Sequence, residues 1–162
     1  MSEAVASHDP VASDDAITGH DWRQLFIPIM SVMGLLVSGY LTWIHWSHSA
    51  ALCSGVGDCE VVNSSEYADV AGIPIALFGF CMYAAILGLS IYRSRVSMAV
   101  ESSLVLAVFG ISLAGVLYSA YLTYLELAVI HAICPWCVTS AVLITIIFAA
   151  SLRDVMRMTG ES

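Results

Sequence analysis

Polar and apolar residues are segregated along this chain into long blocks and do not alternate. Four apolar blocks are each long enough to cross the hydrocarbon core of a bilayer, which takes about 20 helical residues: approximately Leu25–Trp46, Ile73–Tyr92, Ser102–Leu125 and Ala128–Leu152. The first two contain no Asp, Glu, Lys or Arg. The first turns of the fourth hold Pro135 and two cysteines, so we expect the membrane-embedded helix to start near them. The pattern predicts an all-α integral membrane protein, a bundle of four transmembrane helices.

Composition agrees with a membrane domain and bounds its extent. Hydrophobic residues make up 59% of the chain and charged residues 11%, whereas ordinary soluble domains carry roughly 25% charged residues. Four helices in 162 residues leave no room for a second domain, so we expect one membrane domain over residues 23–157. The net charge of −8 implies no nucleic-acid partner.

The two ends of the chain differ from the membrane domain. Residues 1–22 contain five acidic residues and too few large apolar groups to collapse, so we expect a disordered acidic tail. A secretory signal would need a basic start and a cleavage site after a short apolar core, which this segment lacks. Residues 158–162 are expected to form a short C-terminal tail.

The basic residues predict the orientation in the membrane. The chain has no lysine and five arginines, which precede the first block or follow the second and the fourth: Arg23, Arg93, Arg95, Arg153 and Arg157. With four crossings, all five lie on one side, which the positive-inside rule makes cytoplasmic. We therefore expect cytoplasmic termini in an inner or plasma membrane, and outward loops at roughly 47–72 and 126–135.

Four of the five cysteines fall in or beside the two outward loops: Cys53, Cys59, Cys134 and Cys137. Outward loops meet an oxidising compartment, in which disulfides persist. Cys134-Pro135-Trp136-Cys137 is a Cys-x-x-Cys motif, which suits thiol–disulfide exchange because its sulfurs can bond or separate with little backbone movement. Cys81 lies inside the second block and is expected to be a small packing residue.

The four loop cysteines allow three interpretations. They could form static disulfides, or a four-cysteine zinc centre, although the 53–59 separation is wider than zinc sites normally use. The third interpretation is a redox relay. A motif that begins a transmembrane helix places Cys137 near exposed backbone N–H groups, which favour thiolate over thiol. A sulfur activated there would meet an apolar two-electron carrier dissolved in lipid, and a quinone has these properties.

Several of these residues together resemble the bacterial form of the vitamin K epoxide reductase family. The resemblance is carried by Cys53, by Cys59 with Ser65 six residues later, by Gly72-Ile73-Pro74, and by Cys134-Pro135-Trp136-Cys137 opening the fourth helix. The stretch from Cys59 to Ala68 and on to Phe78-Gly79 is especially similar. The similarity covers nearly the whole chain after the acidic tail. Many bacterial relatives carry a fused thioredoxin-like domain, so this chain is expected to be a stand-alone form.

The family resemblance implies a fold and an activity. It implies a four-helix bundle that binds a quinone, ubiquinone or menaquinone, near the outer membrane surface, with no metal. A short loop helix through about residues 60–68 would cap the pocket, with Ser65 near the active centre assisting the chemistry. Vertebrate members have a tyrosine four residues after the second cysteine of the motif, where this chain has Ala141. The resemblance therefore favours a general quinone reductase that generates disulfides.

Carried over by position, the resemblance also implies an order of electron transfer. Cys137 would react with the quinone, Cys134 would exchange with Cys59, and Cys53 would meet the protein partner. That partner would be a separate periplasmic or extracellular thioredoxin-fold protein of the DsbA type, which contacts the enzyme at the outer face of the bilayer.

Two other functions use the same set of residues. A DsbB-type oxidase would carry its Cys-x-x-Cys motif in the first outer loop, whereas here the motif starts the fourth helix. A non-catalytic membrane scaffold would hold its cysteines in static disulfides.

Three further residues near the motif have open roles. Trp136 is a candidate wall of the quinone pocket or an interface aromatic. His131 is a candidate to stabilise a thiolate or a solvated loop residue. Glu126 is expected to be a snorkelling or loop charge.

Overall fold

A computed structural model describes residues 14–47, 61–62, 65, 68–70, 72–93, 95 and 98–160. Within these ranges the long helices are α1 (Asp14–Ser47), α3 (Ile75–Arg93), α4 (Met98–Leu125) and α5 (Pro135–Gly160). A π-helical turn, η2 (Glu126–Ile130), extends α4, and two short strands, β1 (Asp69–Val70) and β2 (Ile73–Pro74), precede α3. All four long helices are long and apolar enough to cross a membrane. The expected all-α bundle of four transmembrane helices is confirmed.

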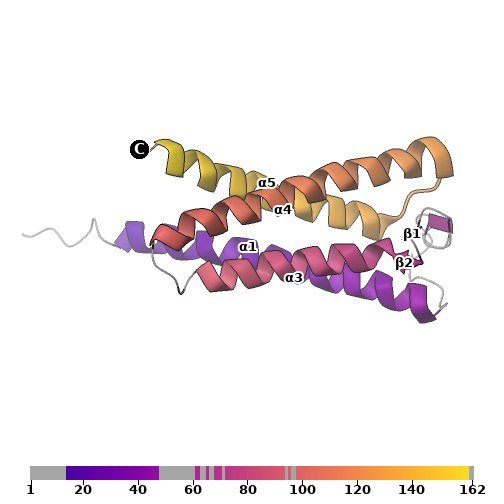
Figure 1. Cartoon of the computed structure of the whole chain (residues 1–162), viewed down its shortest axis with the longest axis horizontal. Helices are drawn as coiled ribbons and strands as arrows, with labels where there is room; N and C mark the ends of the chain where they lie inside the picture. The colour runs from indigo at the N-terminus through magenta and orange to yellow at the C-terminus, as the bar shows by residue number, and fades with distance from the viewer. Residues whose placement is uncertain are drawn as a thin grey trace, which may run out of the picture.

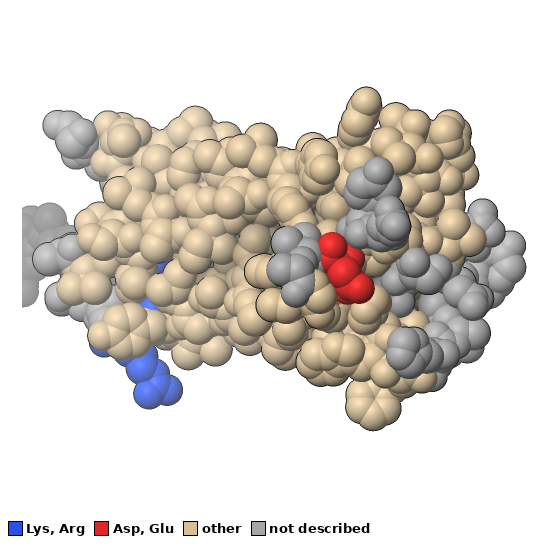
Figure 2. Space-filling view, turned by 45° about the vertical axis from the view of Figure 1, so that its right-hand side comes forward, with Lys and Arg blue, Asp and Glu red and all other residues tan. Residues whose placement is uncertain are grey.

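The four helices lie side by side along the long axis of the molecule, with α1 against α3 and α4 against α5 (Figure 1). The centre of the bundle is filled by side chains with almost no exposure, among them Tyr83, Ile86, Ile144 and Ile147. Large apolar side chains also point outward: Leu36 is 69% exposed and Leu117 is 64% exposed. Figure 2 shows one such face, on which uncharged side chains predominate and basic groups occur only toward one end. A surface of this kind suits contact with lipid.

Two helix boundaries differ from the sequence-based expectations. Helix α1 starts at Asp14, inside the segment expected to be disordered. Helix α5 continues to Gly160, through most of the expected C-terminal tail. Its start at Pro135 confirms that the fourth helix begins at the cysteine motif, because proline is favoured in the first position of a helix.

The expected loop helix through residues 60–68 falls partly outside the described residues. Val61 and Val62 are helical, whereas Ser65 and Ala68 are not. Cys53 and Cys59 also lie outside the described part of the chain, so their expected roles stay predictions.

The arginine positions all lie toward one end of the bundle. The start of α1, the end of α3, the start of α4 and the end of α5 meet at this end (Figure 1). Here Arg93 contacts Glu101 of α4 at 3.0 Å and Asp154 of α5 at 2.8 Å. A single guanidinium therefore links the ends of three helices.

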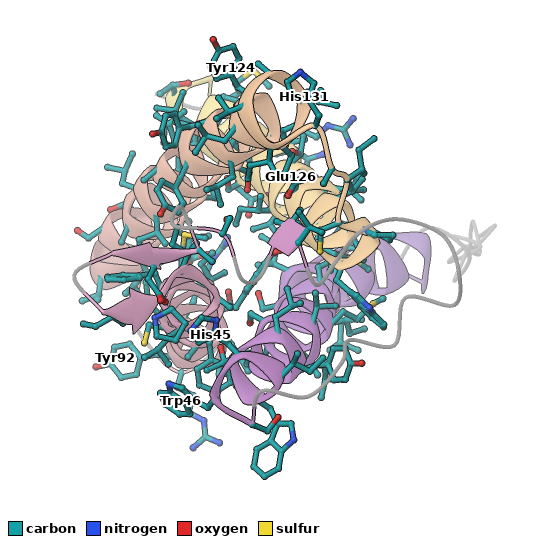
Figure 3. The ribbon with its side chains drawn as sticks, turned by 90° about the vertical axis from the view of Figure 1, so that its right-hand side faces the viewer. His45, Trp46, Tyr92, Tyr124, Glu126 and His131 are labelled. Atoms are coloured by element: carbon teal, nitrogen blue, oxygen red, sulfur yellow. The ribbon has the colours of Figure 1, made fainter. Side chains whose placement is uncertain are left out.

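The opposite end carries the β-hairpin and η2. The strands pair antiparallel, with Asp69 opposite Pro74 and a turn at Gly72, whose φ of 80° favours glycine. His45 Nε2 of α1 lies 3.2 Å from Asp69 Oδ1 and connects α1 to this hairpin. In Figure 3, His45 extends from α1 toward the strands. The hairpin therefore lies at this end of the bundle, next to the end of α1.

Candidate functional site

A cavity of about 630 Å³ lies in the half of the bundle that the hairpin covers. All four long helices contribute to its wall, which is mostly apolar and includes Leu41, Ile75, Phe78, Met82, Leu122 and Ile144. Its volume lies in the range typical of sites for small organic ligands. The chemically reactive groups in the wall are Cys134, Cys137 and Glu126. The cavity therefore combines a dry interior with thiol groups.

The two cysteines of the motif stand at the start of α5, where the loop enters the helix. Cys134 is 1% exposed and Cys137 is partly buried, and both are free thiols. The N–H of Cys137 donates to Cys134 Sγ at 3.4 Å, and the N–H of Val138 donates to Cys134 O at 3.0 Å. Cys134 is thus the N-cap of α5, because Pro135 takes the first helical position and leaves the residue before it to cap the first turn.

The capping contacts decide which sulfur is more readily ionised. The hydrogen bond from the Cys137 side chain, with further bonds from the backbone N–H groups of Cys137 and Trp136, holds the pKa of Cys134 below its ordinary value, against burial and the charge of Glu126. The expectation that the helix start favours a thiolate at Cys137 is therefore wrong. An N-cap side chain turns back toward the N–H groups of the second and third helical residues, whereas Cys137 is itself that third residue.

Glu126 is the residue of the site whose role the sequence analysis missed. It was expected to be a loop or snorkelling charge, but it is 5% exposed and lines the cavity. Its Oε2 accepts the N–H of Cys134 at 3.4 Å, and its carboxylate is hydrogen-bonded to the Cys137 side chain. An acidic residue in the two-residue gap between the third and fourth apolar blocks was the available signal, because ionisable groups in membrane segments are often functional.

The π-helical turn begins at Glu126, and its hydrogen bonds close on the carbonyl group of this residue. The N–H of Ala132 closes the turn on Glu126 O at 3.1 Å, and His131 leaves it in the left-handed conformation with φ 55°. Figure 3 shows Glu126 on the inner side of the bundle, whereas Tyr124 and His131 lie on its outside. Glu126 lies on the same helical face as the cavity residues Ser119 and Leu122 of α4, because residues three and four apart share one face of an α-helix.

The remaining sequence-predicted residues divide between the cavity and the outer surface. Ser65 lines the cavity, and its Oγ donates to Val62 O at 2.8 Å. Trp136 does not line the cavity, so its assignment to the pocket wall is wrong. Its ring packs against Tyr40 with centroids 5.0 Å apart, because the residue before Cys137 projects from a different face of α5.

Two residues with open roles lie away from the cavity. His131 is exposed, with Nδ1 3.2 Å from Val129 O. Cys81 is exposed on α3 and is not packed inside as expected. Within the described ranges, no three His, Cys, Asp or Glu side chains gather as metal ligands would.

Comparison with known proteins agrees with this arrangement. The model of the vitamin K epoxide reductase family matches residues 25–152, which include the four apolar spans and every cavity residue discussed above. The thiol-disulfide oxidoreductase LTO1 of Arabidopsis thaliana is 34% identical over 126 residues, which is 75% of this chain and 34% of that relative. The chain thus spans about a third of the length of that protein. On the extent of the family match, the chain belongs to the vitamin K epoxide reductase family.

Proposed function

We propose that this protein is a membrane thiol–quinone oxidoreductase that reduces a quinone and passes the disulfide so formed to a separate thioredoxin-fold protein. The observation that carries the proposal is the position of Cys134 and Cys137 in the wall of an apolar cavity of about 630 Å³ between membrane-spanning helices. The name of the Arabidopsis relative, a thiol-disulfide oxidoreductase, supports the thiol chemistry.

The cavity wall fits a quinone as substrate. Phe78, Met82 and Leu122 provide apolar surface for a ring and an isoprenoid tail. Ubiquinone and menaquinone are both apolar and confined to the bilayer, so a pocket between membrane helices can receive either. The volume admits the ring and the first part of the tail.

The chemistry proceeds by two thiol–disulfide exchanges and one quinone reduction. A reduced partner gives two electrons to a Cys53–Cys59 disulfide, and the thiolate of Cys59 then attacks Cys134 of the oxidised motif. The S–S bond to Cys137 breaks as a Cys59–Cys134 mixed disulfide forms. Cys53 then attacks Cys59, which restores the Cys53–Cys59 disulfide and leaves the motif as a dithiol. The dithiol then gives two electrons and two protons to the quinone, which leaves as quinol while the Cys134–Cys137 bond forms again.

The lowered pKa of Cys134 suits this order of events. In the dithiol, Cys134 carries the nucleophilic thiolate that closes the disulfide onto Cys137. Cys137, which projects into the cavity wall one turn further along α5, is the sulfur that faces the substrate.

We also propose that the arginine end of the bundle faces the cytoplasm and the cavity end faces outward. The support is the gathering of all five arginine positions at one end, as the positive-inside rule requires of a cytoplasmic side. The thiols then work in a compartment where newly made disulfides persist.

Quinol formation by purified protein in lipid nanodiscs tests the function. The enzyme is supplied with a reduced DsbA-type protein and a short-chain ubiquinone or menaquinone. We expect Cys137→Ala to lower turnover by about 100-fold or more, because the proposed electron path to the quinone ends at this sulfur. Cys81→Ala is the matched control, since Cys81 is exposed on α3 away from the cavity; it should turn over like wild type.

Turnover of the Cys137→Ala variant at the wild-type rate would refute the proposal. Alkylation of the free thiols distinguishes a redox relay from a non-catalytic scaffold. A scaffold keeps its cysteines oxidised whatever the state of the quinone pool, whereas a relay changes its fraction of free thiols when the pool is reduced.

A further inference from the structure

Glu126 is an acidic group in a place where acidic groups are rare. It is 5% exposed and lies within the apolar span Val100–Ile130. The ion pairs of the described residues involve Asp69, Glu101 and Asp154, and none of them includes Glu126. A carboxyl group in such a place is costly to retain unless it serves the site around it.

The contacts of this carboxyl group are with the two cysteines. Oε2 accepts the N–H of Cys134 at 3.4 Å, which anchors the carboxyl group at the start of α5. The hydrogen bond with the Cys137 side chain joins the carboxylate to the thiol that faces the substrate. Glu126 also lines the cavity directly. It therefore touches both the proton that must leave Cys137 and the space in which the substrate is reduced.

The thiol of Cys137 has no other obvious route for its proton. Cys134 Sγ, its other hydrogen-bond partner, has a pKa lowered from its ordinary value, so it is less basic than an ordinary thiolate. His131, the histidine nearest in sequence, is exposed on the outside of the bundle. Among the described residues, Glu126 is the one carboxyl group that lines the cavity together with Cys137.

We propose that Glu126 is a catalytic residue that accepts the proton of Cys137 and delivers it to the quinone. This inference rests on the proposed quinone reductase function. The proton of the Cys137 thiol moves to the Glu126 carboxylate, and the Cys134 thiolate attacks Cys137 Sγ as two electrons pass from Cys137 to the quinone. The S–S bond forms and the S–H bond of Cys137 breaks.

The balance of the reaction is complete in this scheme. The quinone gains two electrons and two protons, one from Glu126 and one from solvent. The solvent proton replaces the one that Cys134 released when it ionised. Glu126 ends the cycle as the carboxylate with which it began, so the net reaction is dithiol plus quinone giving disulfide plus quinol.

A purely structural role for Glu126 makes a different prediction, which glutamine can test. The side-chain oxygen of glutamine can accept the N–H of Cys134 as the carboxylate does, but glutamine cannot take up a proton. Glu126→Gln should therefore preserve the local structure and slow the chemistry. Glu126→Asp keeps an acidic group on a shorter side chain. Glu101→Gln is the matched control, because Glu101 pairs with Arg93 at the opposite end of the bundle.

The experiment is single-turnover reduction of a short-chain ubiquinone by the pre-reduced full-length enzyme in nanodiscs, followed from about pH 5.5 to 9. We expect Glu126→Gln to lower the rate near pH 7 by about 100-fold, the usual scale of general acid–base catalysis. Its rate should rise with pH, because hydroxide then removes the proton of Cys137. Glu126→Asp should keep the wild-type shape of the profile at a lower rate, and Glu101→Gln should match wild type.

A Glu126→Gln rate and pH profile equal to those of wild type, in a preparation where Cys137→Ala is inactive, would overturn the role of Glu126 alone. Failure of wild-type enzyme to form quinol would overturn the quinone reductase function and this inference with it. If Glu126→Gln does not fold, the pH profile of Glu126→Asp tests the inference instead. A wild-type profile shape supports the inference, and a rate that rises throughout with pH contradicts it.

Discussion

The contact between Gly34 of α1 and Tyr83 of α3 offers a quantitative test of how the bundle is packed. Tyr83 is fully buried, and its hydroxyl donates to Ser140 O of α5 at 2.8 Å. A Cβ built on Gly34 would overlap the Tyr83 ring. Gly34→Ala therefore forces either the ring or the helices to move, and the ring cannot move without disturbing the bond to α5.

The size of the effect follows from three terms. Overpacking of a well-filled core costs about 1–3 kcal/mol, and loss of the Tyr83–Ser140 hydrogen bond adds about 1 kcal/mol. The higher helix propensity of alanine returns about 1 kcal/mol. We expect Gly34→Ala to lower the free energy of unfolding by about 1–3 kcal/mol.

Reversible unfolding in sodium dodecyl sulfate, followed by circular dichroism, measures this loss. Gly88→Ala is the matched control, because nothing lies within 4 Å of a Cβ at Gly88; its stability should equal or exceed that of wild type. Tyr83→Leu in the Gly34→Ala background should remove the overlap, so the two substitutions should couple favourably in a double-mutant cycle. Equal stability of Gly34→Ala and Gly88→Ala would show that the helices do not pack through this contact.

Two further predictions concern the site itself. In the reduced enzyme, the pKa of Cys134 should be lower than that of free cysteine when thiolate absorbance is followed against pH. Cys137→Ala should raise the pKa of Cys134, because it removes the largest stabilising contact of the thiolate. An unchanged titration in the variant would contradict the capping argument. Because this pKa is lowered on folding, the stability that Cys134 contributes is present at high pH and is lost as the pH falls through the folded pKa. Unfolding of Cys134→Ser at several pH values should therefore lack this pH-dependent contribution. Ala141→Tyr adds a large side chain to the cavity wall and should raise the KM for a long-tailed quinone more than for a short-chain one. Equal KM changes for the two substrates would argue against substrate binding in this cavity.

Much of the fold could be predicted from the sequence, because the responsible forces act on whole blocks of residues. Apolar blocks of membrane length predicted the four helices, and the arginine positions predicted a shared end. Pro135 marked the start of α5, since proline suits the first position of a helix. Pro135 also implies that Cys134, the residue before it, is the N-cap of α5. The activated thiolate was nevertheless expected at Cys137.

Side-chain direction near the motif was harder to predict. Glu126 faces the cavity on the same helical face as Leu122, but the expected helix end at Leu125 placed it in a loop. The turn η2, which extends the helix beyond Leu125, is not announced by the local sequence. Trp136 was a candidate for the pocket wall or for an interface aromatic, and it does not line the cavity because adjacent helical residues project in different directions. Which of these side chains face the dithiol depends on the three-dimensional packing of the helices, and hydropathy carries no information about that packing.

The N-cap position of Cys134 has a consequence for the energetics of electron transfer. Its lowered pKa means that the first turn of α5 stabilises the charged sulfur, and only the reduced motif has that charge to stabilise. Favouring the reduced form raises the reduction potential of the Cys134–Cys137 couple, so the disulfide becomes a stronger oxidant. One turn of a membrane helix thereby favours the reduced motif, and the Cys137 side chain provides more of that stabilisation than the backbone N–H groups do.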